Sequence, residues 1–290
     1  MEGNYTSPVR VAVVSTDFPA TYSENLLSLG YKAKTVHALL AEAAKAKPDI
    51  IVFPEDSNVI FYLGTSTAAK ILEEGGKDIL LVDSSPTSVS SKNKEKMIFY
   101  RPGEDKQTTE EKHFLVPYGE YLPYHAILLA RIFRKSEWLS DFNGTREYAK
   151  GDIPKPYYFG REVLGALFCS EIIPENFYRK LAQGGAGLFV NASSQAIFGG
   201  NTVLRNQTLS MAKMKAVANR RYFIQSGNMA ATLVLNDSGE IIAAADEGKG
   251  VFVAPVYFNY AKTPYTRFGD WVVPASVLLL ILVAYFRRGR

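Results

Sequence analysis

The sequence predicts an α/β protein in which mixed β-sheets carry helices on their outer faces. Three observations support this class. Strand-like apolar segments outnumber helical ones, residues 9–53 have the pattern of a βαβ unit, and later strands are joined by short polar turns. A chain of 290 residues with 47% hydrophobic content can bury one large core. We find no internal repeat, linker or low-complexity stretch, so we expect one principal folded domain.

The N-terminal half begins with the βαβ unit. Residues 9–15 (VRVAVVS) predict a strand, residues 25–47 a helix, and Pro48 leads into a strand over 49–53. A crossover between parallel strands of one sheet is expected to be right-handed. The other elements expected in this half are a short helix over 67–74 and an antiparallel pair of strands over 78–83 and 96–100.

The C-terminal half repeats the alternation of strands and helices. A buried strand over 164–168 ends on Cys169, and a helix over 175–182 follows Pro174. A strand over 187–192 comes next, and then a helix over 202–219, for which we expect Leu209, Met211, Met214 and Val217 mostly inward. The last predicted strands cover residues 222–225, 231–236, 241–244 and 251–257, with a hairpin turn over 236–239.

Cys169 is the only cysteine of the chain, and it lies where a strand turns towards a helix. Such a turn can lift a side chain out of a sheet and present it to a substrate, as a nucleophile elbow does. By itself, a cysteine beside Leu167 and Phe168 is more often a small buried hydrophobic residue. The functional interpretation therefore depends on what other segments bring to the same place.

Two further segments end in groups that suit a cysteine nucleophile. Residues 50–55 (IIVFPE) are an apolar strand that ends on Glu55, and residues 111–120 (EKHFLVPYGE) carry Lys112 and then Glu120. A carboxylate can accept the thiol proton, and an ammonium can lower the thiol pKa and stabilise an oxyanion. Considered alone, Glu55 would be interpreted as a helix cap or a solvent-exposed residue, and Lys112 as a solvent-exposed residue.

Taken in this order, the three segments resemble the Glu-Lys-Cys triad of the carbon–nitrogen hydrolase (nitrilase) superfamily. Within it, the chain is most similar to the catalytic domain of the apolipoprotein N-acyltransferases. The segments that carry this similarity are KHFLVPYGEYLP (112–123), SMAKMKAVANRR (210–221) and TPYTRFGDW (263–271). The resemblance covers about residues 9–286, and it leaves out the N-terminal bundle of membrane helices of that family.

The resemblance implies a four-layer α-β-β-α sandwich and a covalent mechanism. Glu55 would be the general base, Lys112 the cation that holds the oxyanion, and Cys169 the nucleophile. The supporting residues that it implies are Glu120, Glu171 and Ser170, the last through its backbone N–H. His113 adjoins Lys112, but neighbouring side chains in an extended segment point to opposite faces, so we interpret it as structural.

The reaction that the resemblance implies is N-acylation of lipoproteins. A fatty acyl chain would pass from a phospholipid donor, through a Cys169 thioester, to the N-terminal amine of a lipoprotein acceptor. One alternative is a membrane-tethered carbon–nitrogen hydrolase acting on a small amide, and another is a nitrilase-fold subunit without activity. We assign no cofactor and no metal, since no Cys/His cluster has ligand spacing. A net charge of +4 without a basic stripe argues against nucleic acid.

A membrane location is suggested by the C-terminal segment. Residues 271–286 are apolar and uncharged, and a basic tail over 287–290 follows. We predict a transmembrane helix here, with a buried C-terminal helix as the alternative. Basic residues favour the cytoplasmic side, which would put the catalytic domain on the extracytoplasmic face of the bacterial inner membrane.

The expected partition has a polar tail over 1–8, the catalytic domain over 9–262 and a linker motif over 263–270. Within the domain, residues 124–160 are a possible membrane-facing arm. For residues 135–160, a surface insertion and a helix packed on the core are the alternatives. Three explanations for the start of the chain stay open. Separately encoded membrane helices could be partners, the start could be truncated, or the protein could be tail-anchored and face the cytoplasm.

Overall fold

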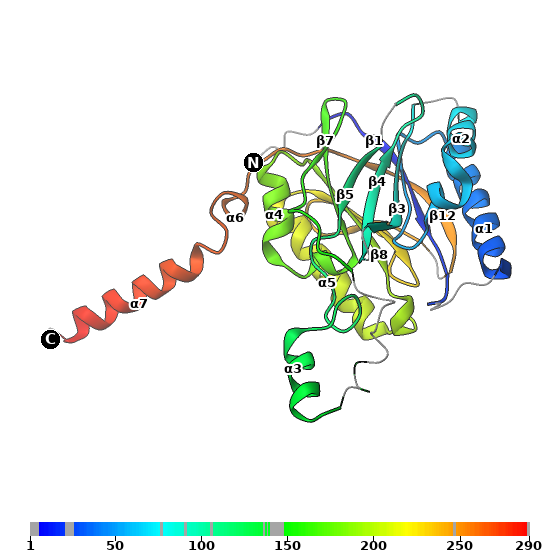
Figure 1. The fold of residues 1–290 in the computed structure, drawn as a ribbon. Coiled ribbons are helices and arrows are strands. Elements are labelled where there is room, and N and C mark those ends of the chain that lie inside the picture. The colour runs from blue at the N-terminus through cyan, green and yellow to red at the C-terminus, as the bar shows by residue number, and fades with distance from the viewer. Residues whose placement is uncertain are drawn as a thin grey trace.

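The computed structural model describes residues 6–20, 26–75, 78–89, 92–104, 107–135, 137, 139, 148–245 and 248–288. Within these residues the strands form two sheets of six strands each (Figure 1). The first sheet runs in the order β12 (Gly250–Val256), β1 (Val9–Ser15), β2 (Ile50–Val52), β3 (Leu80–Val89), β4 (Lys92–Tyr100) and β5 (Thr108–Glu111). The second runs in the order β11 (Ile241–Ala244), β10 (Leu233–Leu235), β9 (Tyr222–Asn228), β8 (Leu188–Ser194), β7 (Glu162–Phe168) and β6 (Tyr157–Phe159).

Helices cover the outer face of each sheet, so the four-layer α-β-β-α sandwich is confirmed. Helices α1 (Leu26–Lys45) and α2 (Val59–Glu74) pack on the first sheet, where alternate strand residues form a shared apolar cluster with them. Helices α4 (Glu175–Gln183) and α5 (Thr202–Asn219) cover the second sheet in the same way. Each strand residue that faces a helix alternates with one that faces the other sheet.

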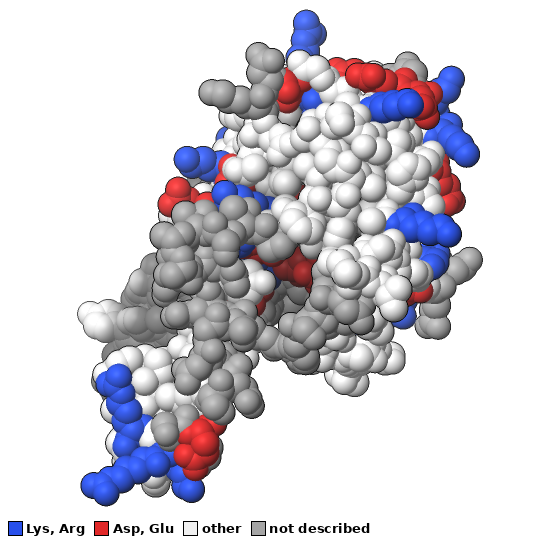
Figure 2. Space-filling model, turned by 45° about the vertical axis from the view of Figure 1, so that its right-hand side comes forward, with Lys and Arg blue, Asp and Glu red and all other residues white. Residues whose placement is uncertain are grey.

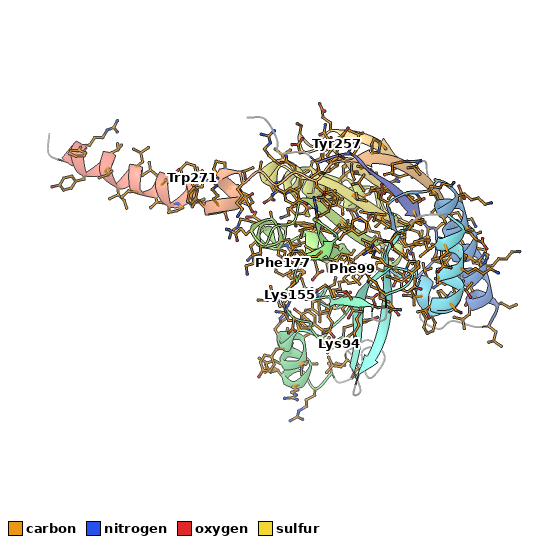
Figure 3. The ribbon with its side chains drawn as sticks, turned by 90° about the horizontal axis from the view of Figure 1, so that it is seen from above. Lys94, Phe99, Lys155, Phe177, Tyr257 and Trp271 are labelled. Carbon is orange, nitrogen blue, oxygen red and sulfur yellow. The ribbon has the colours of Figure 1, made fainter. Side chains whose placement is uncertain are left out.

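The core between the two sheets is apolar and continuous. It consists mainly of Val, Ile, Leu and Phe side chains from the inner faces of both sheets. Phe99 of β4, labelled in Figure 3, stacks on Tyr157 of β6 across this core, with ring centroids 4.2 Å apart. This packing fixes the two sheets face to face, and so it fixes the ends of their strands relative to each other.

Most predicted elements are present, with shifted ends. Strands β1 and β11 and helix α5 have the predicted boundaries. As expected, β1 and β2 are parallel. The pair β3–β4 is antiparallel, as predicted, but both strands are longer than expected. Strands β5 and β6 were not predicted, and α2 begins at Val59 rather than at residue 67, across a kink at Gly64. The predicted inward face of α5 was partly wrong, because Met214 and Val217 are 64% and 49% exposed.

The C-terminal part leaves the sandwich. A short helix α6 (Pro264–Phe268) packs beside α4 and α5, and α7 (Val272–Arg288) then extends away from the body, with Trp271 at its base (Figures 1 and 3). In the described part of the chain, no helix has the length and apolar character needed to cross a membrane. α7 has 17 residues, or roughly 25 Å of helix, against ~30 Å of hydrocarbon, so the span predicted over 271–286 is not supported.

The segment predicted as an arm contains helix α3 (Tyr124–Ile132), which projects from the body of the sandwich (Figure 1). Ala130 is its one buried residue, whereas Tyr124, Ile132 and the following Phe133 are 60–75% exposed. α3 therefore buries little of its surface against the sandwich. Residues 136, 138 and 140–147 of the same segment lie outside the described residues.

Candidate active site

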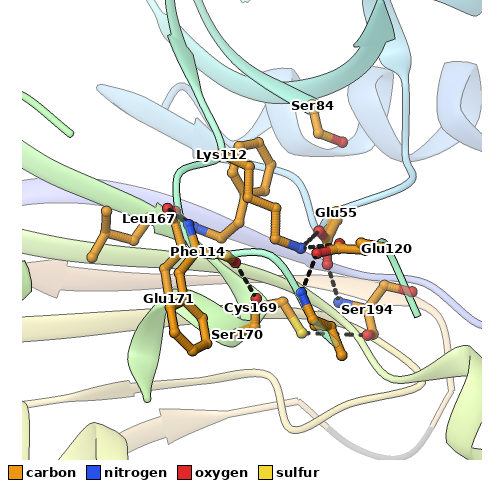
Figure 4. A network of polar contacts seen from close by, with 12 residues as sticks. Glu55, Ser84, Lys112, Phe114, Glu120, Leu167, Cys169, Ser170, Glu171 and Ser194 are labelled. Carbon is orange, nitrogen blue, oxygen red and sulfur yellow. Dashed lines mark hydrogen bonds and ion pairs between the residues drawn. The ribbon is translucent and has the colours of Figure 1, made fainter. Parts of the chain in front are cut away.

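Three segments bring the candidate residues to one edge of the sandwich. Glu55 follows β2 and Cys169 follows β7, so both lie beyond the carboxyl ends of parallel strands, where open α/β sheets form their sites. Lys112 comes directly after β5. Because the sheets pack face to face, the strand ends of one sheet meet those of the other, and the three side chains converge (Figure 4).

The Lys112 ammonium is the centre of this group. Its Nζ lies 2.8 Å from Oε1 of Glu55 and 2.5 Å from Oε1 of Glu120, and the side chain is 2% exposed. Burial lowers the pKa of Lys112, but the two carboxylates, with a further contribution from Cys169, raise it well above its usual value. Lys112 therefore stays protonated and is held by two acids.

Glu55 is held in a tight turn between β2 and α2. Asp56 and Asn58 of this turn both have positive φ, and the carboxylate of Asp83 accepts hydrogen bonds from the backbone N–H groups of Val59 and Ile60 at 3.1 and 2.9 Å. Burial raises the pKa of Glu55 to about 7, and Lys112 opposes this rise. A carboxyl group with such a pKa can both accept and return a proton near neutral pH.

Cys169 opens a short 3₁₀ turn, Cys169–Ile172, at the end of β7. Its thiol is partly exposed and donates to the carbonyl of Ser194 at 3.4 Å, while the backbone N–H of Ser194 donates to Oε2 of Glu55 at 3.1 Å. Burial, and next the Glu55 charge, raise the pKa of Cys169 to about 12, against the effect of Lys112. The resting thiol is thus protonated, and it needs a base to become a nucleophile.

The supporting residues predicted from the sequence lie beside the triad. Glu120 Oε2 accepts from the backbone N–H of Val116 at 2.7 Å, which holds the loop that also bears Lys112. The Glu171 carboxylate accepts from the backbone N–H groups of His113 and Phe114 at 2.7 and 3.2 Å. Burial raises the pKa of Glu171, and these hydrogen bonds oppose the rise.

The side chains of Ser170 and His113 both contact backbone carbonyl groups. The Ser170 hydroxyl donates to the carbonyl of Phe114 at 2.9 Å, and the His113 ring nitrogen Nδ1 lies 2.8 Å from the carbonyl of Gly151. His113 thus has the structural role that we predicted. Ser170 and Glu171 both join the turn that carries Cys169 to the segment that carries Lys112.

Sequence reasoning missed Ser194, Asn228 and Glu95 at this edge. Asn228 at the end of β9 donates to the Ser194 hydroxyl at 3.1 Å and accepts from the Thr16 hydroxyl at 2.9 Å. Ser194 ends β8, so its position at the end of a parallel strand was the signal that could have found it. Glu95 lies inside a hairpin strand and gave no such signal.

Comparison with known proteins assigns the chain to a family. A profile of the carbon–nitrogen hydrolase family matches residues 10–263. The chain belongs to that family. Residues 10–263 hold all the site residues described above, from Glu55 to Asn228.

Sequence relatives of this carbon–nitrogen hydrolase family member include named acyltransferases. The chain is 27% identical to the apolipoprotein N-acyltransferase of Nitrosomonas europaea over 283 residues, which cover 95% of this chain and 54% of that protein. It is 25% identical to the enzyme of the same name from Pasteurella multocida, over 88% of this chain and 50% of that protein. The chain therefore spans about half the length of these relatives.

Solved structures support the fold of the carbon–nitrogen hydrolases. Nit3 of Saccharomyces cerevisiae, a member of the nitrilase superfamily, has a TM-score of 0.63 at 15% identity, with 93% of this chain and 96% of that chain covered. A nitrilase-superfamily amidase from Nesterenkonia has a TM-score of 0.59 at 15% identity, covering 86% and 90%. At this identity the likeness concerns the fold.

Proposed function

We propose that this carbon–nitrogen hydrolase family member is an N-acyltransferase. It would move a fatty acyl chain from a phospholipid, through a thioester on Cys169, to the N-terminal amine of a lipoprotein. The observation that carries the proposal is the buried Lys112 ammonium between Glu55 and Glu120, beside a protonated thiol. The named relatives support the choice of acyl transfer over amide hydrolysis.

In the first half-reaction, Glu55 accepts the Cys169 proton as the sulfur attacks the ester carbonyl of the donor. The bond between sulfur and the carbonyl carbon forms, and the oxyanion is held by Lys112 and by the backbone N–H of Ser170. The ester C–O bond then breaks, and Glu55 returns the proton to the leaving alcohol. One well-placed oxyanion donor is worth ~2.7–4 kcal/mol of barrier, so Lys112 should be essential.

In the second half-reaction, the acceptor amine attacks the thioester carbonyl. The C–N bond forms and the C–S bond breaks. The proton that the amine nitrogen loses passes by way of Glu55 to the departing Cys169 sulfur, which restores the thiol. The roles of Glu120 and Glu171 are to hold Lys112 and to keep its segment beside the Cys169 turn.

A lipid donor and a lipid-modified acceptor agree with the apolar surface that α3 and α7 expose. The exposed side chains of α3 and α7 are large and hydrophobic, and such exposure is typical of protein or lipid contact. We propose that the enzyme acts at the bacterial inner membrane. The extracytoplasmic face stays a prediction of the sequence.

A two-product assay tests the proposal. Purified protein would be incubated with a phospholipid that carries a labelled acyl chain and with a diacylglyceryl-cysteinyl peptide whose amine is free. We expect labelled amide on the peptide and no transfer to the same peptide with an acetylated amine. Cys169→Ala and Glu55→Gln should abolish the product.

Glu111→Gln is the matched control, because Glu111 adjoins Lys112 but forms an ion pair with Lys94 at 2.7 Å on the outer side. It should keep the wild-type rate. Ammonia release from small amides without labelled peptide would overturn acyl transfer in favour of an amidase. Absence of both products from the wild type would overturn the enzymatic assignment of this chain.

A further inference from the structure

Glu95 is a buried carboxylic acid that the proposed mechanism does not use. It is 6% exposed, and its Oε1 has no hydrogen-bond partner among the described residues. Leaving a buried carboxyl group without a partner is costly, so native proteins rarely tolerate it without a reason. The residue lies on β4, and its backbone carbonyl accepts from the N–H of Lys112 at 2.9 Å.

The Glu95 side chain points towards the active site. On β4 it shares a face with Met97 and Phe99, which belong to the core between the two sheets. Glu95 lies closer than these residues to the strand end next to Lys112. Burial, followed by the charges of Asp56 and Glu55, raises the pKa of Glu95 well above its usual value, and Lys112 opposes this rise. The carboxyl group is therefore protonated while the site is empty. Here we call Glu55, Asp56, Glu95 and Glu120 the acidic cluster.

The acidic cluster has more negative than positive charge. Four carboxyl groups share Lys112, whose ammonium already contacts Glu55 and Glu120. Asp56 is exposed and has a φ of 68°, so it extends the cluster to the surface. Acidic atoms are visible at the bottom of a hollow on the face drawn in Figure 2. A second cation would offset the remaining charge of the cluster.

We propose that Glu95, assisted by Asp56, is the binding site for the ammonium form of the acceptor amine. The inference rests on the proposed function, because it names the group that this acyltransferase recognises on its acceptor. A primary amine is protonated near neutral pH, and it forms a strong, charge-assisted hydrogen bond with a carboxyl group that gives up its proton when the amine binds. Oε1 of Glu95, which has no hydrogen-bond partner among the described residues, is free to accept that bond. Binding of the acceptor would give Oε1 of Glu95 the hydrogen-bond partner that it lacks.

The chemistry of the acceptor agrees with this position. An ammonium cannot attack a thioester until it loses one proton. Glu95 would release its own proton to water as the ammonium binds, and would then accept one proton from the ammonium, which leaves the neutral amine. The neutral amine then attacks as described above, and its second proton goes to the Cys169 sulfur.

The test separates the two half-reactions. The acyl-enzyme would be formed from phospholipid alone and then mixed with either the free-amine lipopeptide, which is cationic, or hydroxylamine, which is neutral near pH 7. We expect Glu95→Gln to form the acyl-enzyme at the wild-type rate. It should raise the KM for the lipopeptide about tenfold or more, and leave discharge by hydroxylamine unchanged.

Two further variants keep the test decisive. Asp56→Asn alters an exposed residue, and Asn tolerates a positive φ, so this variant should fold and raise the same KM by a smaller factor. Glu111→Gln should leave both discharge rates at the wild-type value. If Glu95→Gln does not fold, an unchanged KM in Asp56→Asn overturns the inference.

The outcomes distinguish this inference from the proposed function. A wild type that forms no acyl-enzyme would overturn the proposed function itself. A normal acyl-enzyme in Glu95→Gln that is discharged by the lipopeptide as in the wild type would overturn only the ammonium site. Equal slowing of both nucleophiles would also overturn it, because a general structural effect does not depend on the charge of the nucleophile.

Discussion

The Glu171 carboxylate accepts a hydrogen bond of 2.7 Å from the backbone N–H of His113. With its other oxygen, Glu171 accepts from the N–H of Phe168 at 2.9 Å, at the start of the turn that carries Cys169 (Figure 4). One buried side chain thus joins the segment after β5 to the turn after β7. It fixes Lys112 and Cys169 relative to each other without contacting the thiol.

Glu171→Gln should loosen this connection. An amide has one oxygen acceptor, so its NH₂ group would face a backbone N–H donor that the carboxylate now binds. We expect a loss of about 1–3 kcal/mol in the free energy of unfolding, measured by urea denaturation, and a slower acylation of Cys169. An unfolding free energy within about 0.5 kcal/mol of the wild type would contradict the role given to this carboxylate.

Lys112→Met removes the cation between two buried acids. We expect a loss of about 3–5 kcal/mol in the free energy of unfolding, because Glu55 and Glu120 are left without their partner. The double variant Lys112→Met/Glu55→Gln should recover part of this stability and none of the acylation. If the single variant is as stable as the wild type in the same denaturation experiment, the ion pair does not have the burial described here.

The acylation rate should rise with pH through about 7. Glu55 must be ionised to accept the Cys169 proton, and burial raises its pKa to about 7. The rate of acyl-enzyme formation at pH 5 should therefore be about a hundredfold below its plateau. Rapid-quench measurements from pH 5 to 9 would reveal this, and a flat profile would exclude Glu55 as the base.

The same pKa shift has the opposite consequence for stability. The folded state binds the Glu55 proton more tightly than the unfolded state, whose ordinary pKa is 4.5. The stabilisation is complete below pH 4.5 and is lost as the pH rises through about 7. Glu55→Gln should therefore remove part of the fall in unfolding free energy over this range, and an unchanged slope would contradict the shift.

Gly151 is a point where a single methyl group should disturb the site. Its N–H donates to the Lys112 carbonyl at 2.9 Å, and an added Cβ would lie 2.4 Å from the Cβ of Glu111. Gly151→Ala should cost about 1–3 kcal/mol of unfolding free energy and slow acylation, since Lys112 must move. Gly250→Ala, where the added methyl group meets no atom within 4 Å, is the control and should acylate normally.

The sequence was sufficient for the layers and for the candidate triad, but not for the contacts that hold the site. The segments before Glu55 and Cys169 are apolar throughout and bounded by turn residues, so their patterns are clear even though β2 has only three residues. β5 and β6 have only four and three residues, and β5 (TTEE) is polar throughout, so periodicity could not reveal them. Propensity likewise could not show that α2 continues across Gly64.

Other features depend on tertiary packing, which a single sequence does not display. Met214 and Val217 suggested an inward face on α5, yet Lys215 and Asn219 are buried there. The Lys215 ammonium donates to the carbonyl of Pro174 before α4, and Asn219 accepts from the hydroxyl of Thr266 in α6. Glu95 is similar. In the sequence it is one acid in the charged hairpin KNKEK, and only the alternation of β4 shows that it faces the core side.

The most direct test of the account is the intact mass of the protein after incubation with phospholipid and no acceptor. We predict a gain of one acyl chain that hydroxylamine removes, and its absence in Cys169→Ala and in Glu55→Gln. An acyl adduct that persists in Cys169→Ala, or a wild-type protein that gains no mass while it remains folded, would contradict a thioester on Cys169.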